Sequence, residues 1–540
     1  MSTVSVSQRR IPGISRLFSE YLYDFGKVAR FYPAGAPFDC DRLTRAAQAL
    51  RFPQVRRKAL VRMLARQNEH WGPEGKSPLA TNGLIERLGE PDTVAIVTGQ
   101  QVGLFGGPLL GFLKAMSAVL VAERLRQRGV SAVPIFWMAT PDHDLAEVNQ
   151  AWALDAASSV QCFKADVHSE APAPVGRMRL PESIVAVEEA WDQAITAAPG
   201  PEPAALRSAY APGATFADAY AQMFARWFAP WGLILFDPMQ APEAAEPWRP
   251  LYQAAAGRHA ELGALLRQRG EDLENGGYHI QVAQSANASM LFLHRDGARI
   301  GLRRQNDAWL IGDEPLSDAE LNSWLGDHPS DVSASALLRP VLQDALFPTV
   351  AQVAGPAETA YLAQSAVLYQ ALGVRQPVAW PRASATLLDA KARRLLEKNG
   401  LSFDEAWHTS AAELLARKAL PPGAERRARD LHAAFDREFE ALAGELETLD
   451  PTLVDAAQGA VQKIRHQLEQ LEARVARSLA RRSGEIVSQA QHLDALLHPN
   501  GSLQERVLAT AAFAARYPGL CGQLHDALDV TSPEHHALEL

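Results

Sequence analysis

Apolar residues change their spacing along the chain, and each change marks a predicted element. Residues 1–90 combine helical spacing with many polar positions, which predicts a helical N-terminal segment packed on a core. The β-branched run at 94–97 predicts a buried strand, residues 109–128 predict a helix with one broad apolar face, and residues 132–138 predict a second strand. Together they predict a β-α-β unit with a parallel, right-handed crossover.

Further apolar runs follow this unit. Residues 357–372 predict a helix, and Ser317 with Glu320 predicts a capping box at the start of another. An Arg-Asp-Gly turn at 295–297 predicts a β-hairpin. The runs that predict strands are 232–237, 279–283 (a weaker pattern), 290–294, 298–303 and 309–312.

The last third of the chain has heptad-like spacing. Its apolar positions lie on both sides of Asp450 and Pro451: Phe435, Phe439, Leu442, Leu446, Leu449, Val461, Ile464, Leu468, Leu471 and Val475. Two such helices joined by an Asp-Pro turn predict an antiparallel helical hairpin. A second helix over 453–497 would be about 65 Å long. Its partner cannot cover that length, so the apolar stripe predicts a dimerisation surface; a helix folded back over the core is the alternative.

Composition narrows the class of protein. The chain has 540 residues, 47% of them hydrophobic and 21% charged, which is typical of a soluble protein of several structural units. The net charge of -9 argues against a nucleic-acid binder. Three scattered cysteines without a Cys-x-x-Cys pair predict neither a disulfide framework nor a zinc ribbon. With no signal peptide and no apolar run of membrane length, we expect a cytoplasmic protein that does not contact a membrane.

A glycine-rich turn joins the first strand of the β-α-β unit to its helix. Its glycines allow a ligand to approach the backbone closely, and the N–H groups at the helix start favour an anion. Lys114, one to two turns into the helix, could reach a phosphate, although a solvated lysine is the plainer alternative. The turn matches neither the dinucleotide nor the P-loop fingerprint, so NAD is not expected. A purely structural turn is the other interpretation.

Asp142, His143 and Asp144 directly follow the second strand of the unit. Because ligands bind outside the carboxyl ends of parallel strands, we expect this triplet to converge with the glycine-rich turn. Two carboxylates beside an imidazole can orient the ring or hold a divalent cation such as Mg²⁺. No second histidine has metal-ligand spacing, so zinc is not expected. An ordinary surface loop is the alternative.

A third polar group lies further along the chain. Glu358 and Tyr361 are one helical turn apart and share a face. Polar residues so dense in an apolar region predict the wall of a site, with a hydrogen-bonded network between domains as the alternative. The group comprises Arg339, Gln343, Asp344, Gly355, Glu358, Tyr361 and Arg382.

These residues carry a family resemblance. The stretches TGQQVGLFGGPLLGFLKAMSAVLVAERL (98–125) and VPIFWMATPDHDLAEVN (133–149) resemble the signature region of the cysteine-adding ligases of bacillithiol biosynthesis. The resemblance continues, in order and over nearly the whole chain, through GLILFDP (232–238), RPVLQDALFPTVAQVAGPAETAYLAQ (339–364), PR (381–382) and LHPNGSLQERV (497–507).

The resemblance implies an α/β fold with a Rossmann-like parallel-sheet core and a C-terminal α-helical antiparallel coiled coil that forms a homodimer. The implied divisions are a helical lead-in (1–90), the core (91–390) with inserted segments (about 155–230 and 240–335), the coiled coil (391–500) and a tail returning to the core (501–540). It also implies a ligase that adds L-cysteine to the amino group of glucosaminyl-malate, the last step of bacillithiol biosynthesis, after ATP or a related nucleotide activates the carboxylate.

Residue roles follow from the same resemblance. The nucleotide would be bound by Thr98, Gly99, Gln100, Gln101, Gly103, Gly106, Gly107 and Lys114. Catalysis would fall to Asp142, His143 and Asp144. The substrates would be bound by Asn149, Arg339, Gln343, Asp344, Gly355, Glu358, Tyr361 and Arg382. Two alternatives stay open: a nucleotidylyltransferase-like enzyme that joins another acid and amine, and a non-catalytic coiled-coil assembly protein.

Overall fold

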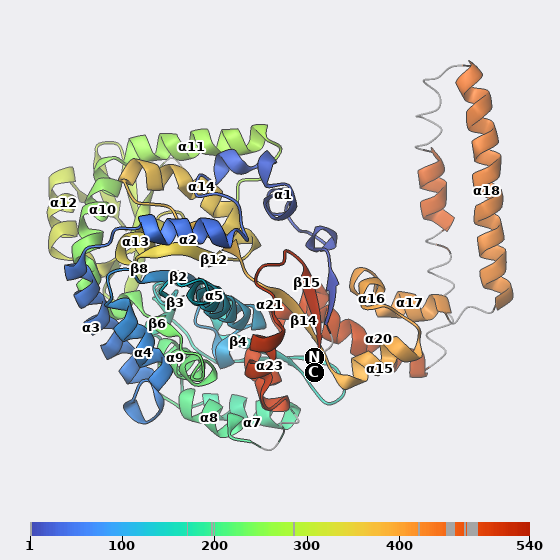
Figure 1. Ribbon diagram of the computed structural model, residues 1–540, viewed down its shortest axis with the longest axis horizontal. Helices are drawn as coiled ribbons and strands as arrows, with labels where there is room; N and C mark the ends of the chain where they lie inside the picture. Colours follow the sequence, from blue (N-terminus) through green and yellow to red (C-terminus); the bar gives the residue numbers. More distant parts are fainter. Residues whose placement is uncertain are drawn as a thin grey trace.

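The computed structural model describes residues 3–169, 171–195, 198, 200–284, 287–418, 422–449, 460–468, 471 and 484–540 (Figure 1). Its centre is a sheet of five parallel strands in the order β13-β12-β2-β3-β6. The strands are β2 (Val94–Gln100), β3 (Ala132–Met138), β6 (Ile234–Phe236), β12 (Thr349–Ala354) and β13 (Val378–Pro381). The chain enters this sheet at its middle strand, β2, and continues outward to β3 and β6. It then returns to the other side of β2, where it forms β12 and β13. The order therefore reverses between β2 and β12.

Alternate residues of β2 enter two different apolar clusters, one on each face of the sheet. Val94 and Ile96 pack with α5 (Leu109–Gln127), whereas Ala95 and Val97 pack with helices α3 (Gln54–Trp71) and α4 (Leu79–Leu88). Because both faces are covered, the strand is apolar without alternation, as expected for a buried parallel sheet. The predicted β-α-β unit is confirmed, and the predicted strand 132–138 coincides with β3.

A second sheet lies in the inserted region, with five antiparallel strands in the order β10-β9-β8-β7-β11. They are β7 (Ala288–Arg295), β8 (Ala298–Gln305), β9 (Ala308–Ile311), β10 (Glu314–Leu316) and β11 (Val332–Ala334). The predicted hairpin is confirmed, and Gly297 at its turn has a φ of 78°. The capping box at Ser317 and Glu320 is confirmed as well.

The prediction of a strand at 279–283 is wrong, because the structure has no strand there. The backbone N–H groups of Gln281 and Val282 donate to the side-chain oxygen of Gln364, and the amide nitrogen of Gln364 donates back to the Val282 carbonyl. A glutamine side chain thus satisfies the backbone groups that a strand would have paired.

A third sheet joins the two ends of the chain. β1 (Thr3–Val6) pairs antiparallel with β15 (His535–Glu539), and β14 (Ser384–Leu388) pairs parallel with β15 on its other side. The N-terminal segment therefore begins with a strand before its helices. The C-terminal segment also reaches α5, because the Leu109 N–H donates to the Leu508 carbonyl.

Helix α18 (Pro422–Leu449) stands apart from the body of the protein in Figure 1. Arg465 pairs with Asp436 on α18 at 2.6 Å, which joins the two arms of a helical hairpin. The predicted Asp-Pro turn and Val475 lie outside the described residues, as do parts of the helix predicted over 453–497. α20 (Gly484–Leu497) leads back to the body. In the described ranges, no helix is long and apolar enough to cross a membrane.

Candidate functional site

The candidate site lies at the carboxyl edge of the parallel sheet, where the strand order reverses. Ligands of open α/β sheets bind in the crevice at such a point. Here Lys114 of α5, which follows β2, meets Glu358 of α14 (Pro356–Leu372), which follows β12, with 2.5 Å between Nζ and Oε2. The Lys114 side chain is 6% exposed and that of Glu358 14%. An ion pair is thus buried at the expected ligand position.

Lys114 uses all of its donors within the protein. Besides Glu358, its ammonium donates to the Gly99 carbonyl at 2.9 Å and to the Gln100 side-chain oxygen at 2.8 Å. A phosphate could reach Lys114 only by displacing one of these acceptors, so the predicted phosphate contact stays a prediction. Thr98 donates to the Val353 carbonyl and ties β2 to β12.

Glu358 connects Lys114 to the third polar group of the sequence. It accepts the Gly355 N–H at 2.9 Å and the Tyr361 hydroxyl at 3.4 Å. Arg339 donates to the Tyr361 oxygen at 2.8 Å. Burial acts to raise the pKa of Glu358, but Lys114, the Gly355 N–H and Arg339 together hold the pKa below its usual value. Glu358 is therefore ionised at neutral pH.

Asp344 ends this network. Its carboxylate accepts from Gln343 at 3.1 Å and from the Tyr369 hydroxyl, while Arg339 donates to Gln343 at 3.2 Å. Burial raises the pKa of Asp344 to about 6. The structure thus brings together Arg339, Gln343, Asp344, Gly355, Glu358 and Tyr361 as the sequence suggested, around Lys114.

The raised pKa of Asp344 predicts a pH effect on stability. An unfolded aspartate has a pKa near 3.9, so the folded protein holds this proton more tightly, and stability falls as the pH rises from about 4 to 6. We expect Asp344→Asn to remove about 1–3 kcal/mol of this fall. Thermal midpoints measured from pH 4.5 to 7.5 test it, with Asp307→Asn on an exposed loop as the control. Parallel pH profiles for wild type and Asp344→Asn would contradict the assignment.

Asp142 and His143 meet an arginine from the inserted sheet. Gln101 donates to Asp142 at 2.7 Å, and Arg299 of β8 lies 2.9 Å from Nδ1 of His143 and 3.7 Å from Asp142. A guanidinium can only donate, so Nδ1 must accept, and a neutral ring then carries its proton on Nε2. Burial lowers the pKa of Arg299 to about 10, which leaves it charged at neutral pH. His143 is thereby arranged as a hydrogen-bond donor.

The remaining residues of this loop have structural contacts. Asp144 is exposed and caps α6 (Leu145–Val148) by accepting the Glu147 N–H at 3.3 Å. Asn149 is buried at the end of α6, and its side-chain oxygen has no hydrogen-bond partner among the described residues. In the part of the chain that the structure describes, no three His, Cys, Asp or Glu side chains converge on a metal position.

A cavity of about 290 Å³ lies beside Asp142 and Arg299; we call it the Trp137 cavity. Trp137, Arg339, His294 and Ser335 also line it. Among the described residues, the indole N–H of Trp137, Nδ1 of His294 and the hydroxyl of Ser335 are buried without a hydrogen-bond partner. Buried polar groups are rarely left unpaired. These three therefore point to a polar ligand in the Trp137 cavity.

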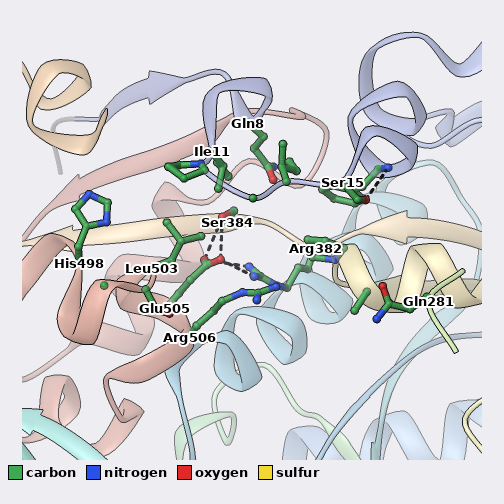
Figure 2. Close-up of a pocket in the computed structure, with 18 of the residues that line it drawn as sticks. Gln8, Ile11, Ser15, Gln281, Arg382, Ser384, His498, Leu503, Glu505 and Arg506 are labelled. Carbon is green, nitrogen blue, oxygen red and sulfur yellow. Dashed lines mark hydrogen bonds and ion pairs between the residues drawn. The ribbon is translucent and has the colours of Figure 1, made fainter. Parts of the chain in front are cut away.

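A second cavity, of about 370 Å³, lies on the β13 side of the Lys114–Glu358 pair; we call it the Arg382 cavity (Figure 2). In Figure 2, Arg382 and Arg506 extend toward each other below Ser15 of the N-terminal segment. Arg382 pairs with Glu505, which is 1% exposed. The backbone N–H of Arg506 donates to the Leu503 carbonyl, but the Arg506 side chain has no hydrogen bond or ion pair in the described part of the chain. Pro356 and Ala357 add the first turn of α14, where N–H groups favour an anion.

The glycine-rich turn is packed rather than open. The Gly106 N–H donates to the Tyr210 hydroxyl at 2.7 Å, and that hydroxyl donates to the Gly103 carbonyl. A Cβ at Gly106 would lie 2.4 Å from the Trp227 ring. Gly107 accepts the Thr510 N–H. Packing thus accounts for these glycines, and their predicted contact with a nucleotide stays a prediction.

Six site residues escaped sequence reasoning: Trp137, His294, Arg299, Ser335, Glu505 and Arg506. Trp137 lies in an apolar strand and Arg299 in a hairpin, where neither shows a local signal. Glu505 and Arg506 belong to the LHPNGSLQERV stretch, so the resemblance could have indicated them. Their partners come from distant parts of the chain, which no local spacing reveals.

Fold and site together define a class: a Rossmann-like α/β protein with a helical hairpin and paired cavities at the carboxyl edge of its sheet. The family described as "Bacillithiol biosynthesis BshC, N-terminal Rossmann-like domain" matches residues 1–383, and its "C-terminal coiled-coil domain" matches residues 385–540. The chain belongs to the bacillithiol biosynthesis BshC family.

Curated relatives match over full length. The chain is 38% identical over 533 residues to a protein of Koribacter versatilis named "Putative cysteine ligase BshC", covering 98% of both chains. It is 35% identical over 543 residues to the protein of that name from Solibacter usitatus, covering 100% of both. For that of Salinibacter ruber the identity is 32%, covering 97% of this chain and 96% of the relative.

Proposed function

We propose that this protein is a cytoplasmic ligase that joins the carboxyl group of L-cysteine to the amino group of glucosaminyl-malate. Full-length similarity to proteins named for cysteine ligation supports the reaction class. The observation that carries the proposal to this site is the set of unpartnered buried groups in the Trp137 cavity, next to a second, arginine-lined cavity. One cavity for each substrate, on either side of a buried ion pair, suits a joining reaction.

The chemistry of each cavity suggests which substrate it takes. In the Trp137 cavity, Asp142 faces Arg299 and Arg339, so the ammonium and carboxylate of an amino acid find opposite charges. In the Arg382 cavity, Arg506 and the first turn of α14 suit the two malate carboxylates. The cysteine carboxylate must first be activated, for which ATP is the proposed reagent: a carboxylate oxygen bonds to a phosphorus of ATP and displaces ADP or pyrophosphate. The sugar amine then loses a proton and attacks the carbonyl carbon, the amide bond forms, and the activating group leaves.

The direct test is incubation of the purified full chain with L-cysteine, glucosaminyl-malate and ATP. We expect a thiol product whose mass is the sum of the two substrates less one water, formed only with nucleotide. No product with any nucleotide would overturn the proposal. Nucleotide-dependent coupling of a different acid and amine would instead favour a nucleotidylyltransferase-like enzyme.

The Ser335→Ala variant tests ligand binding in the Trp137 cavity without disturbing the fold. Its hydroxyl has no protein partner, so Ser335→Ala is expected to leave the thermal midpoint unchanged. A hydrogen bond to a charged ligand is worth about 1.5–3 kcal/mol, so the KM for cysteine should rise roughly tenfold or more. Ser333→Ala is the contrasting variant, because Ser333 contacts His294 and Arg299 and its loss should lower stability. An unchanged KM in Ser335→Ala would move cysteine out of this cavity.

We also propose a homodimer through the helical hairpin. Leu431, Leu442, Ile464 and Leu471 are 45–58% exposed, although such residues are usually covered in coiled coils. We expect twice the monomer mass in sedimentation equilibrium, and monomers for Leu442→Glu combined with Leu471→Glu. Val185→Glu, at an exposed apolar position on α7 (Ile184–Ala194), is the control. A monomeric wild type would refute the proposal.

A further inference from the structure

A third cavity lies at the opposite edge of the parallel sheet, where the strands begin. Its volume is about 540 Å³, and Val350 and Val378 at the starts of β12 and β13 line it. Arg30, Arg42, Arg269 and Arg375 line it as well, and no aspartate or glutamate does. We call it the four-arginine cavity. It shares no residue with the Trp137 or Arg382 cavities.

The four guanidinium groups are only partly engaged by the protein. Arg42, Arg269 and Arg375 each donate to one backbone carbonyl, at 2.9, 3.1 and 3.0 Å. Arg30 reaches the Asp272 carbonyl at 3.4 Å. Within the described residues, the closest carboxylate to any of them is that of Asp39, 4.0 Å from Arg42. A guanidinium has five N–H donors, so most of these donors have no protein acceptor.

Two features indicate a formed site rather than scattered surface arginines. A Cβ at Gly35 would lie 2.3 Å from the Arg42 guanidinium carbon, so this glycine provides the space that the guanidinium occupies. In addition, the Arg42 Nε and the side-chain oxygen of Gln376, which lines the cavity, are buried atoms without a hydrogen-bond partner in the described part of the chain.

Backbone dipoles do not neutralise the positive charge of the four arginines. The last turns of α14 and α11 (His259–Asn275) lie close by and supply about half a negative charge each. Together with Asp39 they offset roughly two of four positive charges. Burial also lowers the pKa of Arg269 and Arg375. An excess of guanidinium groups around one cavity, most of whose donors have no protein acceptor, favours a bound oxyanion.

We propose that the four-arginine cavity binds a small organic polyanion carrying at least two phosphate or carboxylate groups. Its volume falls in the range of small-molecule sites and exceeds the space needed by a single inorganic ion. The unpaired oxygen of Gln376 suits a hydroxyl or amine donor on the same ligand. The site is separate from the proposed ligase chemistry and does not depend on it.

Calorimetric titration of the full chain at constant ionic strength tests the proposal, with pyrophosphate and citrate as probes of the two oxyanion types. We expect at least one probe to bind, and its affinity to fall about tenfold or more in Arg269→Gln and in Arg375→Gln. Arg267→Gln removes an equal charge from the exposed side of α11 and should bind as wild type does. Arg30→Gln serves if a variant does not fold, because its one backbone contact is long.

Two outcomes would overturn the proposal. One is no binding of either probe by the wild type. The other is binding that Arg506→Gln abolishes while Arg269→Gln and Arg375→Gln leave it unchanged, since the anion would then lie in the Arg382 cavity. A preference for pyrophosphate over citrate would identify a phosphorylated ligand, and the reverse preference a polycarboxylate. Loss of ligase activity alone has no bearing on either result.

Discussion

Replacing Glu505 by alanine is expected to destabilise the protein by about 3–5 kcal/mol, because it leaves the Arg382 guanidinium buried without its partner. Glu505 accepts from Arg382 at 3.0 Å, from the Ser384 hydroxyl at 3.0 Å and from the Ala385 N–H at 2.9 Å. Burial acts to raise the pKa of Glu505, yet Arg382 holds it below its usual value. One carboxylate thus connects the C-terminal segment to the end of β13 and the start of β14.

Calorimetric melting and limited proteolysis together measure this effect. We expect a lower thermal midpoint and faster cleavage within residues 501–540. Glu189→Ala, which removes an exposed carboxylate on α7, should melt as wild type does. Glu505→Gln should be the milder change, since it keeps the side-chain shape and one acceptor. A Glu505→Ala protein as stable as wild type would show that Arg382 finds water or another acceptor.

The sequence predicted three of the five parallel strands, β2, β3 and β6, because their apolar runs are local signals, whereas β12 and β13 were not predicted. A run of residues buried on both faces has no polar alternation, so β3 can be predicted within the strand itself. The third sheet could not be predicted this way, since β1 and β15 lie at opposite ends of the chain and their pairing depends on the whole fold. The error at 279–283 has the same origin: a side chain of distant α14 occupies the backbone groups of Gln281 and Val282.

In the candidate site as well, features set by local spacing were predicted and contacts between distant parts of the chain were not. Spacing placed Glu358 and Tyr361 on one face of a helix, and they do lie together. Spacing could not show that Glu358 would pair with Lys114, because that contact arises only when β2 and β12 become neighbours. Nor could it show that Arg299 reaches His143 from the inserted sheet. Residue types indicated a polar site, whereas charge pairing within it depends on tertiary structure.

The Lys114–Glu358 pair can have a structural role, a catalytic role or both. Neither a stability measurement nor an activity measurement alone distinguishes these roles, because the burial of an ion pair is weak support for either. Lys114→Met leaves the Glu358 carboxylate uncompensated, so we expect a stability loss of about 3–5 kcal/mol. If the ammonium also acts in the reaction, kcat/KM should fall by about 10²–10³, as when one preorganised donor to developing charge is removed. A destabilised variant with low activity fits both a structural and a catalytic role.

The double variant Lys114→Met/Glu358→Gln separates the two roles. Glutamine carries no charge, so no uncompensated ion remains, and its single side-chain oxygen keeps an acceptor for either the Gly355 N–H or the Tyr361 hydroxyl. We expect the double variant to regain most of the thermal stability lost by Lys114→Met, while kcat/KM in the coupling assay stays low. Recovery of both would show that the pair serves only to hold β2 against α14. Recovery of stability alone assigns the charges of this pair to the reaction, since the surrounding structure would be intact and only the Lys114 ammonium and the Glu358 carboxylate would be missing.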